Sequence, residues 1–155
     1  MPKGIKKVFL TPLDVVADSD LEGVGTRRFE GDEEYVWAKG VASTAKGSWV
    51  QIAHDYTTAL CSASATTTPK VIGVAMAAIL ANKFGWYCRH GLVSALSAAS
   101  NAAGAQQYLT ATAGVLDDAV VASDVIMDAH LTATVGGAQA LAVYYLEWPS
   151  FNPLL

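Results

Sequence analysis

Large apolar side chains alternate with small or polar ones along much of the chain, with the period of two that is typical of β-strands. In residues 33–40 (EEYVWAKG), this alternation places Tyr35 and Trp37 on one face of an expected strand. Residues 47–56 (GSWVQIAHDY) repeat the pattern, and the Thr- and Ser-rich residues 57–70 are expected to form a strand that leads into a turn. Successive short strands of this kind predict a β-meander.

Residues 71–81 (VIGVAMAAILA) form an apolar run of eleven uncharged residues. A helix that spans a membrane needs about 20 apolar residues, so the run is too short for a membrane anchor. Its alternation of larger and smaller side chains favours a strand that is buried on both faces. After a turn at residues 81–85, residues 86–91 (WYCRHG) are expected to form the second strand of a central hairpin, with Trp86 and Arg89 on opposite faces.

The C-terminal half contains one ambiguous segment. Residues 92–107 are rich in Ala and have the leucine spacing of a short helix, whereas their Ser, Asn and Gly residues favour a strand followed by a loop. Residues 106–118 predict a hairpin, and residues 123–149 predict two further strands. The turn between these two strands is expected at residues 136–137, whose glycines tolerate positive φ, and Pro149 and Pro153 are expected to end the last strand.

Residues 1–30 differ from the rest of the chain. They combine Pro, Gly and dense mixed charge and show no sustained periodicity, which favours an extended segment over a packed element. We therefore expect a mainly β protein, with a compact β-barrel or β-sandwich body at residues 31–155 behind an extended N-terminal arm at residues 1–30. The 155 residues are enough to bury a core without disulfides or a metal.

Charge is concentrated at the N-terminal end of the chain. Residues 1–40 hold six of the ten Lys and Arg residues and eight of the 14 Asp and Glu residues, which leaves ten charges for the other 115 residues. Soluble chains average about one charge in four residues. Because a surface so poor in charge favours association, we expect a homo-oligomer, a dimer or a trimer, that buries much of its surface.

The charge balance also argues against some classes of partner. The net charge is −4 and there is no basic stripe, whereas binding to nucleic acid depends on Lys and Arg. The basic start of the chain is followed by Thr11, Pro12 and Asp14 instead of a continuous apolar stretch, so no signal peptide is expected. The sequence thus predicts synthesis in the cytoplasm, with neither nucleic acid nor a membrane as a partner.

Cys61, Cys88, His54 and His90 are the candidate residues for a zinc site, because four soft or borderline ligands suffice to bind zinc. Their spacing matches no zinc ribbon or zinc finger. Cys88 and His90 are also a candidate nucleophile and base, but side chains two residues apart on a strand stand parallel and seldom meet. Two reduced, buried thiols are therefore the expected interpretation.

The remaining titratable residues predict no catalysis. Asp117, Asp118, Asp124 and Asp128 have neither the alternate spacing nor the glycine of a calcium loop, and they define no acid–base pair. The sequence also lacks a phosphate-binding glycine loop and a nucleophile elbow. We therefore expect a protein that is not an enzyme and that holds no metal and no cofactor.

Four stretches carry a resemblance to a known group of proteins: RRFEGDEEYVWAKGVASTAKGSWVQI, VIGVAMAAILANKFGWYCRHGLVSAL, QQYLTATAGVLDD and GGAQALAVYYLEW. In this order they resemble small structural proteins of tailed bacteriophages that decorate or cement the capsid shell, and the likeness covers residues 27–148. The resemblance implies a β-barrel-like body behind an N-terminal arm. It also implies a non-enzymatic protein on the virion, bound in many copies to the major capsid protein on the outer face of the capsid lattice, where it stabilises the head.

The resemblance offers no fixed set of binding residues, so candidate contacts come from composition. Most aromatic residues recur about once per expected strand and are expected to fill the core. Contacts with the capsid or with another subunit are expected in the arm, at its end and in the turn-rich tail, namely at Val8, Phe9, Leu10, Arg27, Arg28, Trp148 and Phe151.

Other functions remain compatible with the sequence. A tail or neck protein of a phage would share the β body and the surface poor in charge. A host-surface or sugar-binding module would need exposed aromatic side chains in a groove. A small enzyme would need a catalytic site that the pattern does not predict.

Overall fold

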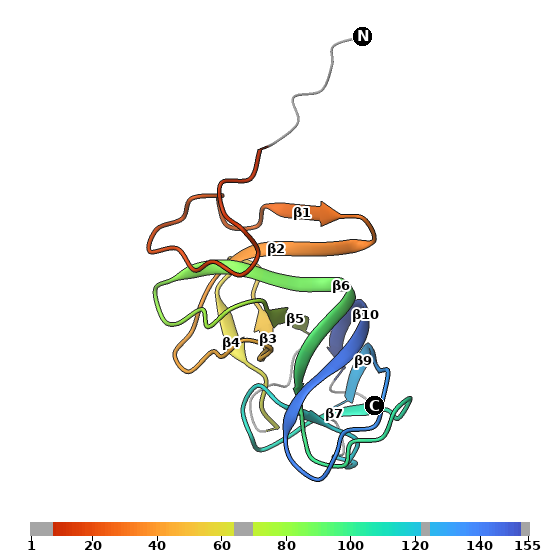
Figure 1. Cartoon of the computed structure of the whole chain (residues 1–155). Helices are drawn as coiled ribbons and strands as arrows, with labels where there is room; N and C mark the ends of the chain where they lie inside the picture. The colour runs from red at the N-terminus through yellow and green to blue at the C-terminus, as the bar shows by residue number, and fades with distance from the viewer. Residues whose placement is uncertain (1–7, 64–69, 122–124, 153–155) are drawn as a thin grey trace.

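The computed structural model describes residues 8–63, 70–121 and 125–152, which form ten strands and no helix. The strands of the first half are β1 (Arg27–Glu30), β2 (Glu33–Lys39), β3 (Trp49–Ile52), β4 (Thr58–Leu60) and β5 (Lys70–Ala75). Those of the second half are β6 (Phe84–Ser97), β7 (Gln107–Leu109), β8 (Leu116–Asp117), β9 (Val125–Leu131) and β10 (Ala140–Asn152). The prediction of a mainly β protein is confirmed (Figure 1).

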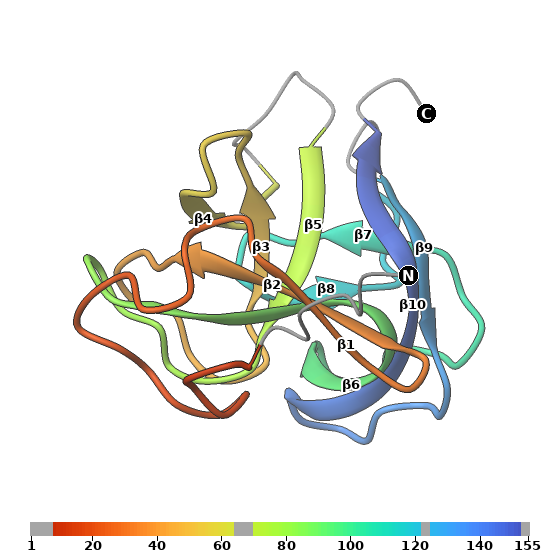
Figure 2. The same ribbon diagram turned by 90° about the horizontal axis from the view of Figure 1, so that it is seen from above.

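Six strands close into a barrel in the order β5, β6, β8, β7, β9 and β10, because β10 pairs with β5 and β5 pairs with β6. The other four strands lie outside this ring. β1 and β2 extend the sheet from β6, whereas β3 and β4 extend it from β5. Seen from above, the curved β6 and β10 wrap one side of the barrel (Figure 2). Of the two expected forms, the protein therefore adopts the barrel.

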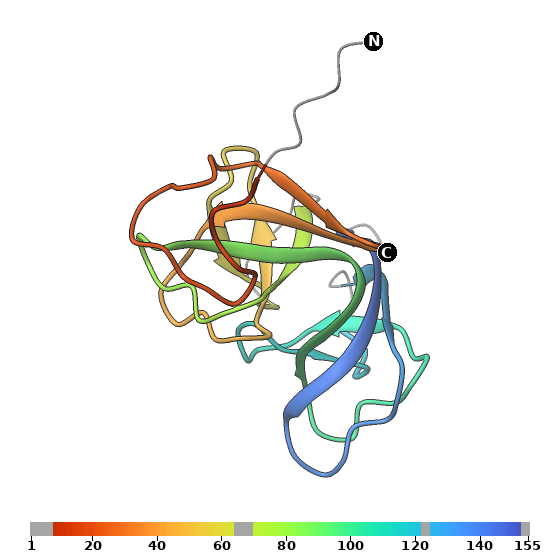
Figure 3. The same cartoon turned by 45° about the horizontal axis from the view of Figure 1, so that its top comes forward.

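β6 joins the two parts of the molecule. Its first half pairs with β2 and β5, and residues 90–97 pair with β10. Figure 3 shows β6, in green, running alongside the orange β2 and then turning down beside the blue β10. The change of partner falls at Gly91, whose φ of 93° lies in the region that favours glycine. A Cβ at this position would lie 2.7 Å from Cγ and 3.2 Å from Cα of Glu33.

Aromatic side chains fill the core. Trp37, Trp49, Trp86 and Tyr144 are fully buried in one cluster, and their rings pack edge to face, with centroids 5.1 Å apart for Trp37 and Trp86 and 5.0 Å apart for Trp49 and Tyr144. A second cluster surrounds Tyr87 on the other face of the sheet and consists of Val36, Ala38, Val50, Ile52, Ala75, Ala77 and Ile79. β5 contributes side chains to both clusters, which confirms the strand that was expected to be buried on both faces.

A group of buried polar side chains lies inside the barrel. Asn101 Nδ2 donates to Ser97 Oγ and to Gln107 Oε1, both at 2.8 Å, and Gln107 Nε2 donates back to Asn101 Oδ1. The Tyr144 hydroxyl donates to Ser97 Oγ at 2.9 Å, and burial raises the pKa of this tyrosine to about 12. The bonds tie β7, β10 and the loop after β6 together, so these polar groups are satisfied although all four side chains are buried.

Residues 8–30 lie against the barrel. The buried carboxylate of Glu22 accepts three hydrogen bonds of 2.6, 2.8 and 2.8 Å from the backbone and hydroxyl around Thr11. Ala17 belongs to the core and bridges to the start of β6, while β1 pairs with β2 along its whole length. Over the described residues, the boundary expected at residue 30 therefore does not separate an arm from the body; residues 1–7 lie outside the described part of the chain.

Two expected elements in the middle of the chain have different limits. β5 ends at Ala75, so residues 76–83 form a connection without regular structure in place of the rest of a strand. β6 continues through residues 92–97 as one strand, so the helix alternative is wrong and the strand followed by a loop is confirmed. Pairing with β10 along this whole stretch outweighs the local helical preference of Ala and Leu.

The last strand also differs from its prediction. β10 runs through Pro149, and its register with β9 shifts between Leu146 and Ser150, where Trp148 has a φ of 55°. A bulge at this point leaves Pro149, which has no N–H, outside the regular ladder. Residues 136–137 lie in the loop before β10 as expected, but neither glycine has a positive φ.

We expect Gly91→Ala to lower the free energy of unfolding by about 1–3 kcal/mol, because Ala must adopt a positive φ there and its Cβ crowds Glu33. Gly104→Ala measures the cost of the positive φ alone, without crowding, since Gly104 has a φ of 72° and open space around it. Gly136→Ala, which has neither constraint, is the matched control. Denaturant unfolding followed by circular dichroism compares the three. Equal stability of the Gly91→Ala and Gly136→Ala variants would contradict the requirement for glycine at the bend of β6.

Candidate functional site

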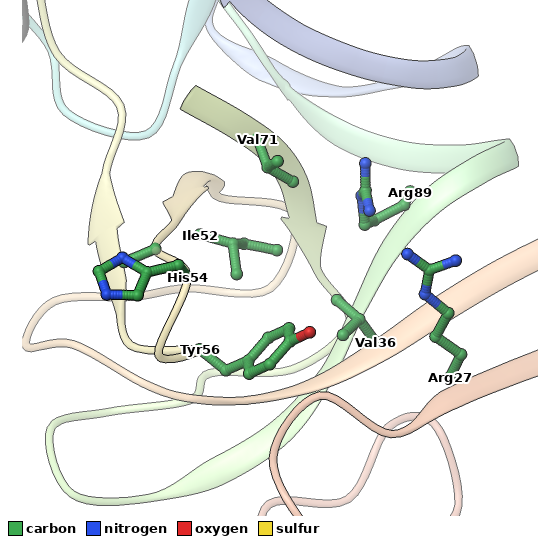
Figure 4. A pocket seen from close by; sticks show the side chains of 8 residues that line it. Arg27, Val36, Ile52, His54, Tyr56, Val71 and Arg89 are labelled. Carbon is green, nitrogen blue, oxygen red and sulfur yellow. The ribbon is translucent and has the colours of Figure 1, made fainter. Parts of the chain in front are cut away.

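A cavity of about 450 Å³ lies beside the second core cluster, where β1, β2, β3, β5 and β6 meet the loop that joins β3 to β4. Val36, Ile52 and Val71 form its apolar wall. Arg27 of β1 and Arg89 of β6 lie on one side of the cavity (Figure 4). The cavity therefore combines an apolar surface with two guanidinium groups.

Tyr56 and His54 lie on the other side of the cavity, in the loop after β3 (Figure 4). Tyr56 has a φ of 59°, its amide donates to the Ala53 carbonyl at 2.9 Å, and its carbonyl accepts from the Lys39 amide at 2.9 Å. Gly25 lies under the Tyr56 ring, because a Cβ at residue 25 would be 2.4 Å from Tyr56 Cε2. These contacts hold the aromatic wall in place.

Arg89 reaches the cavity because β6 alternates. Trp86 and Cys88 point into the first core cluster, so Arg89 lies on the opposite face, as the sequence predicted. It is half-buried, and its Nε has no hydrogen-bond partner among the described residues. Burial lowers the pKa of its guanidinium, and the negative charge of Glu34 opposes this effect. A buried donor without an acceptor is unfavourable. The Arg89 Nε can therefore donate a hydrogen bond to a group that enters the cavity.

Glu34 connects the cavity to a neighbouring aromatic group. Its side chain is 4% exposed, and Oε1 lies 3.5 Å from Arg27 Nε. Its Oε2 accepts a hydrogen bond of 2.6 Å from Trp148 Nε1. The Trp148 indole lies on the His90 ring, with centroids 4.3 Å apart and 31° between the planes, and His90 Nδ1 is 2.6 Å from the Asp32 carbonyl oxygen. Trp148 is thus oriented by two contacts while half of its surface stays exposed.

The outer face of β6 and β10 is apolar. Leu92, Leu141 and Val143 are 54%, 50% and 45% exposed, and we call these three side chains the apolar β6–β10 face. Antiparallel pairing sets Val143 opposite Ser94 and Leu92 opposite Tyr145, which brings the three side chains onto one surface. Neither strand carries a charged residue in this region, from residue 92 to 97 or from 140 to 146.

The expected contacts in residues 8–30 divide into two groups. Val8 and Leu10 are 79% and 68% exposed, so both are accessible to a partner. The Phe9 ring instead packs edge to face on Trp86, with centroids 5.5 Å apart. The Arg28 guanidinium lies over both rings, 5.0 Å from the Phe9 centroid and 5.6 Å from the Trp86 centroid. Phe9 and Arg28 therefore make their main contacts within the chain.

The expected contacts near the C-terminus also divide. Phe151 is 1% exposed and belongs to the barrel core, so its prediction as a subunit contact is wrong. β10 continues past Pro149 and pairs Phe151 with Ile126 of β9, which keeps the residue within the barrel wall. The Arg27 side chain is 58% exposed and Trp148 is 50% exposed. Contact of these two residues with another protein stays a prediction.

The cysteines behave as the sequence predicted. Cys61 and Cys88 are both free and buried. Burial raises the pKa of both thiols, that of Cys88 to about 12. Cys88 Sγ donates to the backbone carbonyl of His90 at 3.3 Å, while the His90 imidazole bonds to the Asp32 carbonyl. A thiol with a raised pKa is a poor nucleophile, so this geometry does not activate Cys88.

Asp128, His130 and Glu147 approach one another on the outside of β9 and β10, with one possible ligand atom from each within 4.8 Å of the others. His130 Nε2 lies 3.8 Å from Glu147 Oε2. The sequence did not predict this group, because the pairing of β9 with β10 brings together residues from separate strands. All three side chains are exposed, and exposed acidic groups of this kind are common without a metal, so we assign no ion to them.

Sequence reasoning missed Arg89, Glu34 and the apolar β6–β10 face as functional candidates. One signal for Arg89 was present: it is the single Lys, Arg, Asp or Glu between Lys83 and Asp117, and it stands in an alternating segment. An isolated charge among buried strand positions indicates a residue with a specific role. Glu34 had no comparable signal, because its partner Trp148 is far away in the sequence.

Comparisons with known proteins do not identify a family. The chain matches no protein-family model, and no curated protein matches it. Within the described residues, no helix has the length and apolar character needed to cross a membrane. The resemblance to capsid decoration proteins therefore stays a prediction from the sequence.

We expect neither native thiol to react with a thiol reagent at pH 8, because their raised pKa values keep Cys61 and Cys88 protonated. In the unfolded chain both thiols ionise near the ordinary thiol pKa of about 8.5. The stability that the neutral, buried thiols contribute is therefore complete below that pH and is lost as the pH rises toward the folded-state pKa.

Reaction with a chromogenic disulfide, in buffer and in denaturant, measures the thiol reactivity. Ala103→Cys, which places a thiol at an exposed position, is the control and should react at once. Unfolding measured from pH 7 to pH 11 tests the pH dependence. Rapid, stoichiometric modification of the native wild-type protein would show that the thiols are accessible and ionised.

Proposed function

We propose that this protein is a non-enzymatic structural protein of a tailed-bacteriophage virion. It binds the outer surface of the capsid lattice in many copies, with the major capsid protein and its own copies as partners, and stabilises the head. The observation that carries the proposal is the apolar β6–β10 face, formed by Leu92, Leu141 and Val143 on a body that is poor in charge. Contiguous exposed apolar side chains on such a body favour contact with another protein.

A second group of exposed apolar side chains supports the same proposal. Val8, Leu10 and Phe29 are 79%, 68% and 64% exposed, and they lie in the N-terminal segment and on β1. β1 is also a strand at the end of the sheet, where charged neighbours discourage pairing with another chain. Contact through side chains in this region is therefore more favourable than strand addition.

A capsid lattice is suited to contacts made by only a few exposed apolar side chains. Each copy buries only a modest apolar area, but a symmetric shell repeats the contact many times, and copies that also touch one another bind with greater avidity. Stabilisation of a head would then come from the number of contacts and not from the strength of a single one. This requirement fits a small barrel with two exposed apolar regions.

The chemistry of the described residues favours a non-enzymatic role. Cys88 and Cys61 are buried thiols with raised pKa values, and the His90 imidazole is bonded to a carbonyl oxygen. The cavity holds two arginines and a tyrosine but no carboxylate–histidine pair of the kind that acid–base catalysis uses. Binding is the activity that these groups support.

A host-surface or sugar-binding module is the second candidate. The half-exposed Trp148, with its ring on His90, is the observation that favours it, because carbohydrate sites use exposed aromatic faces. A tail or neck protein would use the same apolar surfaces as a capsid protein. Copy number separates these candidates.

Quantitative gel analysis of purified particles tests the proposal. We expect the protein at hundreds of copies on DNA-filled heads, because decoration follows the repeats of the lattice. A copy number in the tens or below would favour a tail or neck protein. Absence from particles would overturn both assignments and favour the module that acts apart from the virion.

We expect Leu92→Lys and Val143→Lys each to weaken binding to heads by about tenfold or more, because a buried, unpaired charge opposes an apolar contact. Val120→Lys is the matched control, since Val120 is 78% exposed and lies outside the apolar β6–β10 face. Co-sedimentation of purified variants with heads that lack the protein measures binding, after circular dichroism has shown that each variant is folded. Unchanged binding of both variants would remove this face from the contact.

A further inference from the structure

We propose that the cavity between Arg27, Arg89 and Tyr56 binds an aliphatic carboxylate, that is, a single negative charge carried on an apolar group. This inference does not rest on the proposed virion function, since no residue that lines the cavity belongs to the apolar β6–β10 face that carries that function. Its support comes from the charge of the cavity, from its hydrogen-bonding groups and from its apolar wall.

The charge of the cavity indicates a ligand with one negative charge. Arg27 and Arg89 bring two positive charges, and Glu34, whose Oε1 lies 3.5 Å from Arg27 Nε, compensates for one of them. A net positive charge of one is left, because the negative charge of Glu34 also acts on Arg89. Arg89 is partly buried, and electrostatic attraction is screened less there than at the surface. A monoanion balances this charge, whereas a dianion such as phosphate would leave an excess negative charge next to Glu34.

The hydrogen-bonding groups indicate an acceptor. The Nε atom of Arg89 is buried and has no hydrogen-bond partner among the described residues. Leaving such a donor unpaired is unfavourable, and a ligand that supplies an acceptor removes the penalty. The planar guanidinium presents parallel N–H groups that match the two oxygens of a carboxylate. Tyr56 and His54 offer further polar groups across the cavity.

The apolar wall indicates the rest of the ligand. Val36, Ile52 and Val71 line the cavity, and its volume of about 450 Å³ falls in the range of sites for small organic molecules. A bare inorganic anion would leave this apolar surface uncovered. A carboxylate joined to a short aliphatic chain would fill it, and two sources supply that chemistry: a free short-chain fatty acid, and the chain end of a polypeptide with an apolar last residue.

The cavity is formed before the ligand binds. The Tyr56 wall is held by its backbone bonds to Ala53 and Lys39 and by close contact with Gly25. Arg89 is anchored in β6, between residues that pair with β2 and β5. A site that needs no rearrangement loses less conformational entropy on binding.

The test uses the full chain and titrations followed by NMR of backbone amides, with hexanoate and with a short peptide ending in Leu as probes. We expect both acids to bind with a dissociation constant of about 1 mM or better and to shift the amides of the cavity strands. Hexanamide and the peptide amide should bind at least about tenfold more weakly, because they lack the charge. Tighter binding of the peptide acid would identify a polypeptide chain end as the source, whereas tighter binding of hexanoate would identify a small free acid.

The matched variants are Arg89→Met and Lys46→Met. Both remove one positive charge, but Lys46 is exposed and does not line the cavity. We expect Arg89→Met to reduce hexanoate affinity by about tenfold or more and Lys46→Met to change it by less than about twofold. Arg89→Lys, which keeps the charge but loses the planar donors, should give an intermediate affinity.

Several outcomes would overturn the assignment. Equal affinity of acid and amide would show that charge has no part in binding, and unchanged affinity in folded Arg89→Met would place the site elsewhere. Phosphate binding as tightly as hexanoate would replace the aliphatic carboxylate with a general anion. If Arg89→Met is unfolded by circular dichroism, Arg89→Lys and the comparison of acid with amide decide the question.

Discussion

The bend of β6 at Gly91 is the constraint on which the rest of the structure depends. Before the bend, β6 pairs with β2 and β5; after it, the strand pairs with β10. The residues around the bend therefore serve different surfaces: Arg89 lies at the cavity, His90 lies under Trp148, and Leu92 lies on the apolar β6–β10 face. Since only glycine adopts this φ without strain, Gly91 determines how the cavity, the Trp148–His90 contact and the apolar β6–β10 face are placed relative to one another.

A second irregularity complements the first. The bulge in β10 at Trp148 falls just after Glu147, which is the last residue of β10 to pair with β6 and lies opposite His90. The positive φ of Trp148 turns the indole onto His90 and its Nε1 toward Glu34, so that the two bent strands are joined by side chains where the ladder ends. Bulges commonly re-aim a side chain in this way, and here the result is a half-exposed indole that contacts Glu34 and His90.

The sequence allowed most of the strands to be predicted, because alternation is a local signal that burial on one or two faces imposes. The prediction from the sequence was wrong where pairing between distant strands outweighed a local signal. Gly91 and Pro149 each suggested an end, yet β6 and β10 continue through them, and so Phe151 was assigned to a surface when it lies in the core. The cavity could not be predicted, because its residues come from five strands and a loop that only the closed barrel brings together.

Several charged side chains among the described residues are engaged within the chain, and the Arg89 side chain differs from them. Glu22 binds the turn at Thr11, Glu34 contacts both Trp148 and Arg27, and Arg28 lies over Phe9. Glu22 and Glu34 are buried, so they add no charge to the surface. A surface poor in charge does little to keep the apolar β6–β10 face from associating with another protein. Arg89 instead has a buried Nε without an acceptor among the described residues, an arrangement that lowers stability. Its presence is explained if the acceptor comes from outside the chain.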